Sequence, residues 1–246
     1  MNAHRSDRLA IPLIVLAQMF GTSLWFSVNA VADALLLSWQ LTTVDLGHLT
    51  SAVQLGFICG TFLFAISGLA DRYSASRIFA VCALIGALAN AGFASTEGAL
   101  LPAVLLRFAT GLALAGIYPI GMKMVVGWAP EKAGQMLGWL VGMLVLGTGL
   151  PQFVRGLGIT PDWRTVFYTA SCLAVIAGIC ASLGMAVLQI GAGIEHVFGI
   201  HATGHLGLIA IMVAMTVAFI GSTITGLKKG IKTLALLNVG LALTVL

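Results

Sequence analysis

Residues 99–122 read ALLPAVLLRFATGLALAGIYPIGM, an apolar run of 24 residues with one charge, at Arg107. A helix of about 20 apolar residues is long enough to cross the hydrocarbon core of a bilayer. The whole chain has the same character, because 59% of its 246 residues are hydrophobic and 8% are charged. Soluble domains carry about 25% charged residues. The sequence therefore excludes a soluble domain and predicts an all-α fold, a polytopic bundle of transmembrane helices.

Composition and motifs also exclude several classes of function. The net charge of +4 comes from scattered residues, which excludes a nucleic-acid-binding surface. The four cysteines lie in apolar runs at spacings that match no metal or redox motif. The motifs of metalloproteases, serine hydrolases and phosphate-binding loops are absent from the sequence. We expect no enzyme activity, no cofactor, no metal ion and no nucleic-acid partner.

The hydropathy pattern predicts six long helices, which are Leu9–Leu36, Leu49–Ala70, Ile78–Ala94, Ala99–Met122, Ala133–Val154 and Thr165–Gln189. A polar loop with three histidines is expected at Gly191–His205, and a seventh span at Leu206–Leu227. Glu195 and the histidines of this polar loop fit a solvated membrane-surface loop or, alternatively, a metal cluster. The last apolar run, Thr233–Leu246, has 14 residues. These make about 21 Å of helix, less than the roughly 30 Å core, so we expect a truncated final helix.

Basic residues in the predicted loops indicate the orientation. With the amino terminus inside, the inner side holds Arg5, Arg8, Arg72, Arg77, Lys123 and Lys132, and the outer side through residue 164 holds Arg155 and Arg164. Cytoplasmic loops are rich in Lys and Arg. We therefore expect an integral, multi-pass protein of a bacterial inner membrane with a cytoplasmic amino terminus. The same alternation places Lys228, Lys229 and Lys232 outside, where clustered positive charges are disfavoured.

Arg107 lies about eight residues, or roughly 12 Å, inside its predicted span. A lone charge at such a depth costs at least about 2.5 kcal/mol and normally faces a cavity or a polar partner. The alternative is that Arg107 extends its side chain to the outer interface. The first six predicted spans contain no acidic residue at the depth of a helix centre, so a carboxylate proton relay has no obvious member there.

The turn between the second and third predicted helices reads SGLADRYSASR over residues 67–77. Its acid, Asp71, is followed by two arginines, Arg72 and Arg77. Such an acid can cap a helix or pair with a basic residue, and either contact can form a latch that breaks when helices move. The alternative is an ordinary positively charged inner loop.

This turn resembles the loop between helices two and three of the major facilitator superfamily, where Leu69, Asp71, Arg72 and Arg77 correspond to the gating motif. A second resemblance is Arg107-Phe-Ala-Thr-Gly111, which is similar to the R-x-x-x-G motif in the fourth helix of that family. The resemblance covers residues 9 to about 180. It implies that the six helices form one half of a secondary carrier, that 67–77 is a gating loop, and that Arg107 and Gly111 take part in proton or substrate coupling.

Three residues of the first two helices are candidates for lining a solute path, namely Trp25, Asn29 and Gln54. The alternative is that these polar side chains bond neighbouring helices. In the fifth predicted helix, Gly134, Gly138 and Gly142 repeat every four residues and form a smooth ridge, followed by Gly149 and Pro151. A ridge of this kind allows close helix packing, and the proline allows a bend.

From about Ser182 the sequence is similar to another family, the betaine/choline/carnitine transporters. The segment Ser222-Thr-Ile-Thr-Gly-Leu-Lys-Lys-Gly-Ile-Lys232 carries this resemblance. That family holds quaternary ammonium groups in a cage of tryptophans, but residues 182–246 contain no Trp or Tyr. We predict two parts, a six-helix half at 1–181 and a helical fragment at 182–246.

These observations predict a secondary-active transporter of a small solute that works by alternating access, in an incomplete or chimeric chain. We expect a coupling proton or sodium ion, a lipid bilayer around the helices, and either a second transporter half or self-association. Two alternatives stay open. The chain is a fusion of two transporter fragments that transports nothing, or it is a fragment of a quaternary ammonium transporter.

Overall fold

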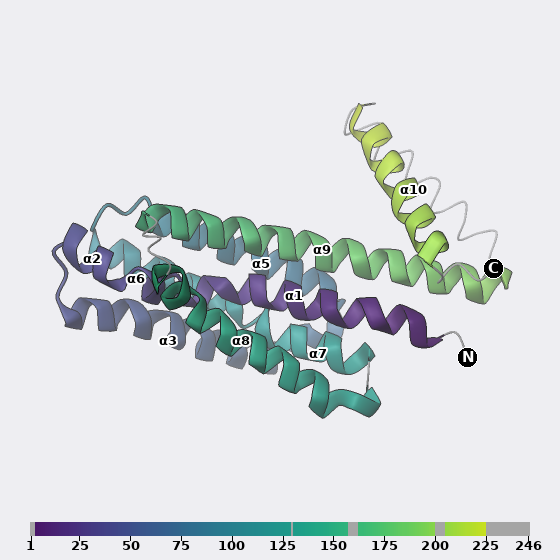
Figure 1. Cartoon of the computed structure of the whole chain (residues 1–246), viewed down its shortest axis with the longest axis horizontal. Coiled ribbons are helices and arrows are strands. Elements are labelled where there is room, and N and C mark those ends of the chain that lie inside the picture. The colour runs from purple at the N-terminus through teal and green to yellow at the C-terminus, as the bar shows by residue number, and fades with distance from the viewer. Residues whose placement is uncertain (1–2, 129, 157–161, 200–204, 225–246) are drawn as a thin grey trace. The chain divides into compact units, whose positions relative to one another are not determined.

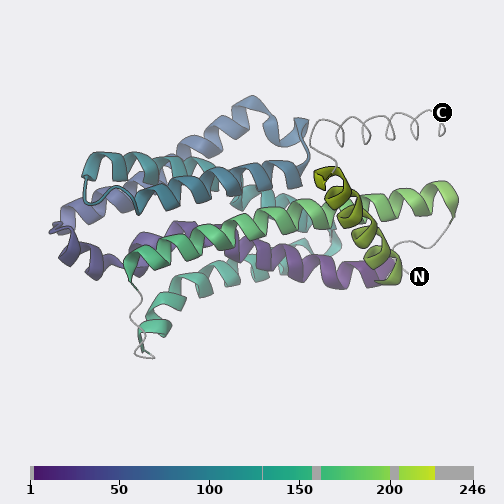
Figure 2. The same cartoon turned by 90° about the horizontal axis from the view of Figure 1, so that it is seen from above.

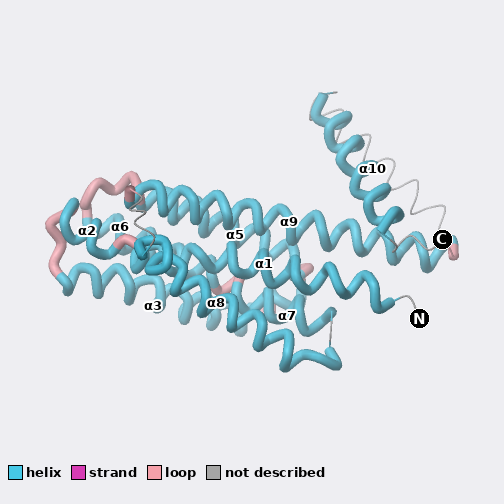
Figure 3. Tube along the Cα trace, in the orientation of Figure 1, coloured by secondary structure: helices cyan, strands magenta, loops and turns pink. Residues whose placement is uncertain are grey.

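The computed structural model describes residues 3–128, 130–156, 162–199 and 205–224. Every regular element in these ranges is a helix (Figure 3), which confirms the predicted all-α fold. The chain divides into two compact units, Met1–Met185 and Ala186–Leu246. The predicted boundary between 181 and 182 lies four residues before this division and stays a prediction about the origin of the two parts.

Helices α1 to α8 belong to the first unit (Figure 1; the same cartoon is seen from above in Figure 2). Their bounds are α1 Ala3–Ala30, α2 Ala32–Ser38, α3 Thr43–Ser67, α4 Leu69–Arg72, α5 Ala75–Phe93, α6 Leu100–Leu114, α7 Tyr118–Trp128, the short 3₁₀ helix Pro130–Lys132 and α8 Ala133–Gly156. Helix α9, Trp163–Phe198, begins in the first unit and ends in the second, which also contains α10, His205–Ile224.

Five segments of the described residues are long and apolar enough to cross a membrane, namely Pro12–Ala30, Thr43–Ser67, Ala75–Phe93, Leu100–Gly127 and Trp163–Gly184. Lipid cannot satisfy free backbone hydrogen bonds, so helices of this length and composition are stable there. The protein is an integral, multi-pass membrane protein. The final predicted run, Thr233–Leu246, lies outside the described residues.

Three predicted helices are divided in the structure. The predicted helix 9–36 is interrupted at Val31, and the helix 99–122 at residues 115–117. The helix 49–70 is interrupted at Gly68, whose φ of +62° is a left-handed conformation that glycine adopts without strain. Hydropathy does not detect these breaks, because the apolar run continues through them.

Helix α3 begins six residues before its predicted start, at Thr43 rather than Leu49. The Thr42 hydroxyl accepts a hydrogen bond from the Asp45 backbone N–H, and the Asp45 carboxylate accepts one from the Thr42 backbone N–H at 2.9 Å. This capping box satisfies backbone donors at the helix start, and it allows the helix to begin in polar sequence.

Helix α9 runs without a break over 36 residues. The expected loop from Gly191 is therefore wrong as far as Phe198, because helical backbone continues through this stretch. At 1.5 Å per residue the helix is about 54 Å long, which exceeds the roughly 30 Å hydrocarbon core.

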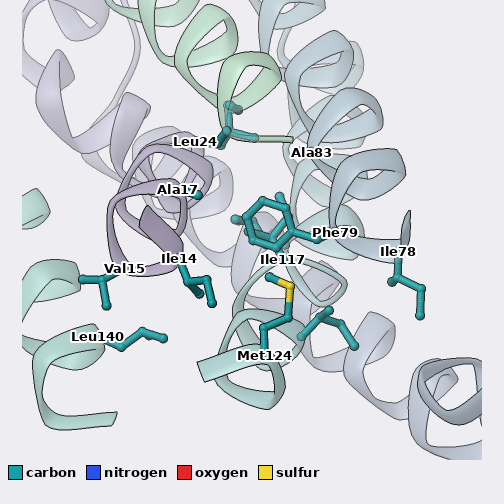
Figure 4. Packing of buried hydrophobic residues seen from close by; sticks show 14 of the residues in the cluster. Ile14, Val15, Ala17, Leu24, Ile78, Phe79, Ala83, Ile117, Met124 and Leu140 are labelled. Atoms are coloured by element: carbon teal, nitrogen blue, oxygen red, sulfur yellow. The ribbon is translucent and has the colours of Figure 1, made fainter. Parts of the chain in front are cut away.

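Two clusters of buried apolar side chains form the core of the first unit. In the larger cluster, Phe79 and Ile117 lie at the centre, with Ile14 and Leu24 of α1 and Met124 of α7 around them (Figure 4). Lipid tails are as apolar as these side chains, so close packing rather than removal from water holds the cluster together.

The smaller cluster is rich in aromatic rings. Phe93 of α5 stacks on Phe167 of α9 with 4.3 Å between the ring centroids, and Trp39 stacks on Phe93 at 5.1 Å. Trp163 meets Trp39 edge to face at 5.4 Å. The cluster ties together the ends of α5 and α9 and the turn after α2.

Candidate functional site

Arg107 is completely buried, with an exposed fraction of 0%. Its Nη1 donates to the backbone oxygen of Leu24 at 3.0 Å and to the Ser27 hydroxyl at 3.2 Å, and its Nη2 donates to the backbone oxygen of Trp25 at 2.8 Å. The side chain therefore points from α6 onto one turn of α1, and the alternative in which it reaches the outer interface is wrong. Its Nε is buried without a hydrogen-bond partner among the described residues.

Asn90 of α5 completes this site. Its Oδ1 accepts from Arg107 Nη1 at 3.2 Å and lies 2.7 Å from Ser27 Oγ. Its Nδ2 donates to the backbone oxygen of Phe167 at 3.1 Å and to the Ser171 hydroxyl at 3.2 Å. The resulting polar cluster, defined as Ser27, Asn90, Arg107 and Ser171, links α1, α5, α6 and α9. All four side chains are buried.

The sequence analysis missed Asn90, Ser27 and Ser171. A usable signal was present for Asn90, because an amide in the middle of an apolar span needs hydrogen-bond partners. The two serines carried no such signal, since a serine hydroxyl commonly bonds to a backbone oxygen of its own helix.

Gly111 lies one helical turn after Arg107, where α6 touches α3. A Cβ added at Gly111 would lie 2.1 Å from the backbone oxygen of Val53, and one added at Gly56 of α3 would lie 2.1 Å from the backbone oxygen of Phe108. Both positions therefore require glycine. The close contact holds α6, and with it Arg107, at a fixed distance from α3.

The three candidates for a solute path have different environments. Trp25 is half-buried, and its ring centroid lies 4.8 Å from that of Phe57 on α3. Asn29 and Gln54 are exposed on the surface of the described chain. The structure brings Trp25 to Arg107 through its backbone oxygen, and the role of all three residues in lining a path stays a prediction.

The loop between α3 and α5 makes an ion pair with α7. Asp71 Oδ1 lies 2.7 Å from Lys123 Nζ, which also donates to the backbone oxygen of Ala70 at 2.7 Å. The hydrogen bond from Lys123, followed by its charge, holds the pKa of the Asp71 carboxyl below its ordinary value. Leu69, Arg72 and Arg77 are exposed, and no salt bridge joins either arginine to an acid within the described residues. The partner of Asp71 is thus 52 residues away in the chain.

The glycine ridge of α8 is not used for packing inside the described chain. A Cβ added at Gly134, Gly138 or Gly142 would meet no atom within 4 Å. The prediction that this ridge packs against another helix therefore finds no partner among the described residues. The side chains at 147–156, and with them Gly149 and Pro151, lie outside the described residues.

The described residues contain no group of three or more His, Cys, Asp or Glu side chains placed to hold a metal ion. The side chains of His196, His201 and His205, which formed the alternative metal reading, lie outside the described residues. Arg107 and the Asp71–Lys123 pair each join different helices of the first unit through a charged group.

Two family models match the chain. The model described as Major Facilitator Superfamily matches residues 13–190. The model described as BCCT, betaine/carnitine/choline family transporter, matches residues 155–246. The two matched ranges overlap at residues 155–190, most of which belong to helix α9.

Several curated proteins are similar to this chain. The uncharacterized transporter YgaY of Escherichia coli O157:H7 is 27% identical over 184 residues, which cover 71% of this chain and 45% of YgaY. The niacin transporter NiaP of Acinetobacter baylyi is 33% identical over 135 residues, 50% of this chain and 30% of NiaP.

The second part of the chain has relatives of another kind. The betaine/ectoine transporter LcoP of Corynebacterium glutamicum is 37% identical over 71 residues, 29% of this chain and 11% of LcoP. The chain spans less than half the length of each of these three relatives. No solved structure matches the chain.

Proposed function

Because the chain belongs to the Major Facilitator Superfamily through residues 13–190, we propose that it forms one half of a secondary-active carrier that moves a small solute by alternating access. Carriers of this type rock two related helix bundles around a site near the bilayer midplane. The observation that carries the proposal is the complete burial of Arg107 in the polar cluster, which links four helices. A buried cation in a membrane bundle is expensive and is retained for function.

The ion pair Asp71–Lys123 serves as the gating contact in this proposal. It joins the α3–α5 loop to α7 on the side that carries most of the basic residues, which we assign to the cytoplasm of a bacterial inner membrane. Since both partners are exposed, the contact can break and form again at low cost when the bundles move. Leu69, Arg72 and Arg77 complete the loop.

The solute we propose is a small aromatic carboxylate, with nicotinate as the first candidate. The relative NiaP is named a niacin transporter. Arg107 can attract a carboxylate, and Trp25, which lies on the turn of α1 that binds the guanidinium, has a half-buried ring that can stack on an aromatic ring. Asn29 and Gln54 are further candidates for the path, and a proton or sodium ion is the coupling ion.

The second six-helix half comes from another copy of this chain or from a different polypeptide. Uptake of radiolabelled nicotinate into proteoliposomes tests the proposal over a series of protein-to-lipid ratios. If two copies form the carrier, uptake per unit of protein rises with protein density, and Arg107→Ala abolishes it. Saturable uptake that is independent of density would assign transport to a single copy. Uptake that is equal in the wild type and in Arg107→Ala would overturn the proposal.

One observation favours a second candidate function, which is the match of residues 155–246 to the betaine/carnitine/choline family. In this alternative the chain handles a quaternary ammonium solute. Glycine betaine is therefore the second substrate in the same uptake assay. Betaine uptake without nicotinate uptake would favour this alternative, and uptake of neither at any protein density would favour a fusion that transports nothing.

A further inference from the structure

We infer that Asn90 is a positioning residue that orients Arg107 without neutralising its charge. This inference rests on the proposed function, because it assigns Arg107 a role toward an anionic solute. It comes from the hydrogen bonds of the polar cluster and from the chemical difference between an amide and a carboxylate.

The orientation of the Asn90 amide is determined by its four neighbours. Nδ2 has two hydrogens, and two acceptors meet them, the backbone oxygen of Phe167 and the hydroxyl of Ser171. The Ser171 hydroxyl donates to that same Phe167 oxygen at 2.8 Å, so it can only accept from Asn90. The amide nitrogen therefore faces α9, and Oδ1 necessarily faces Arg107.

Oδ1 in turn limits where the guanidinium can lie. Arg107 Nη1 reaches Asn90 Oδ1 at 3.2 Å and the Leu24 oxygen at 3.0 Å, while Nη2 reaches the Trp25 oxygen at 2.8 Å. The guanidinium of Arg107 is thus held between α5 on one side and a single turn of α1 on the other. That turn carries Trp25, so Asn90 acts through Arg107 on the position of a candidate path residue.

An amide is the suitable group here because it accepts on one side and donates on the other. A carboxylate at position 90 would place one oxygen against the Phe167 oxygen and would also neutralise Arg107. The groups around Arg107 are neutral, namely Ser27, Asn90 and the backbone oxygens of α1. Among the described residues, the guanidinium donates its hydrogen bonds to these neutral groups and not to an acid. These contacts therefore do not neutralise the positive charge, and in a low-dielectric bundle its field extends over the α1 turn that carries Trp25.

The test compares two isosteric variants by NMR and by uptake. The full chain is labelled with ¹⁵N-arginine in lipid nanodiscs, and the Arg107 guanidinium resonance is assigned by its absence in Arg107→Lys. We expect separate Nη resonances in the wild type, because the hydrogen bonds block rotation of the guanidinium. In Asn90→Leu these resonances should merge or broaden. In Asn90→Asp, which keeps the acceptor, they should stay separate.

Nicotinate uptake separates the two variants in another way. Asn90→Asp should raise the KM for nicotinate at least about 10-fold with a smaller change in kcat, because it neutralises the charge that attracts the carboxylate. Asn90→Leu should lower kcat, because the guanidinium and the α1 turn lose their fixed position. Ser171→Ala is the matched control. It removes one partner of Nδ2 and leaves the Asn90–Arg107 contact, so it should keep separate Arg107 resonances.

Unchanged Arg107 resonances in Asn90→Leu would overturn the inference, since Asn90 would then contribute only to stability. If Asn90→Leu does not fold, a distance measurement in the wild type replaces it. Labelling with ¹³Cγ-asparagine and ¹⁵Nη-arginine should give a dipolar contact that disappears in Arg107→Lys, and its absence would also overturn the inference. If no variant and no wild type transports nicotinate but the resonances depend on Asn90, the proposed function fails and the positioning role stands.

Discussion

The two charged contacts of the first unit lie in opposite environments. Arg107 is 0% exposed and has neutral partners, whereas the side chains of Asp71 and Lys123 are 84% and 48% exposed and form an ion pair. The buried cation donates four hydrogen bonds to two other helices, α1 and α5. The exposed pair is held by one contact between two flexible side chains. The difference teaches that burial, rather than charge pairing, decides which contact determines geometry and which one can open.

The physical reason is the cost of separation. A charged group inside a bundle has no water to replace a lost partner, so its hydrogen bonds hold the helices in one arrangement. An exposed pair exchanges its contact for water and loses little. The buried site is therefore suited to positioning, and the loop pair to gating.

The largest effect is expected from Arg107→Ala, which removes the buried side of the comparison. The variant leaves a cavity and deprives Asn90 Oδ1 of a donor, so we expect a loss of about 2–4 kcal/mol in the free energy of unfolding. Denaturation of the chain in detergent micelles measures it. Arg107→Lys keeps the charge but loses the planar guanidinium, so its free energy of unfolding should lie between those of the wild type and Arg107→Ala. Wild-type stability in Arg107→Ala would contradict the assignment of Arg107 as a structural and functional centre.

The next effect is expected from Gly111→Leu, which displaces α6 and with it Arg107. A Cβ at this position would lie 2.1 Å from the Val53 oxygen, so the helices must separate. We expect a loss of at least about 2 kcal/mol. Gly138→Leu is the matched control, since a Cβ there meets no atom within 4 Å. Equal losses in the two variants would show that the close contact of α3 with α6 does not hold the site.

A smaller effect is expected from Ser27→Ala. Its hydroxyl lies 2.7 Å from Asn90 Oδ1 and accepts from Arg107 Nη1 at 3.2 Å, but both partners keep other hydrogen bonds. Hydrogen bonds between membrane helices contribute about 0.6 kcal/mol on average, and we expect a loss of that order. The same denaturation measurement checks it. A loss as large as that of Arg107→Ala would mean that the cluster depends on Ser27 and not on the guanidinium.

The smallest effect on stability is expected from Asp71→Asn. The pKa of Asp71 is lowered from its ordinary value of 3.8 by Lys123, so the contact stabilises the fold above that pH and is lost as the pH falls through the lower folded value. We expect a stability change that is small, decreases with salt and vanishes below the folded pKa. Urea titrations at neutral and acidic pH, at low and high salt, measure it. Lys123→Gln should give the same result, and a change that does not respond to salt would contradict an exposed ion pair.

Much of the site was predictable where a residue type conflicted with its surroundings. Arg107 was found because a lone charge in an apolar span needs an explanation. Asp71 was found as a latch candidate, but Lys123 was not identified as its partner, because the two lie 52 residues apart and only helix packing brings them together. Asn90 and Ser171 lie 17 and 64 residues from Arg107 in the chain, and no spacing rule connects residues on different helices.

The glycines illustrate the same limit. Every glycine has the same intrinsic helix propensity, whatever its position. Of the five discussed above, Gly56 and Gly111 lie against the backbone of another helix in the described chain, whereas Gly134, Gly138 and Gly142 do not. A period of four residues shows that glycines share one face of a helix. It does not show whether that face meets a neighbour.

The sequence by itself determined that this protein spans a membrane and that the number of its helices is about that of one transporter half. It also determined that Arg107 is a lone charge inside an apolar span. These conclusions depend on local costs, since every apolar run and every buried charge can be judged from its own segment. Only the tertiary structure decided where helices break, which glycines touch a neighbour, and that an amide on α5 orients the buried arginine. Those outcomes depend on which helix faces lie together, and that arrangement is a property of the whole bundle rather than of any single segment.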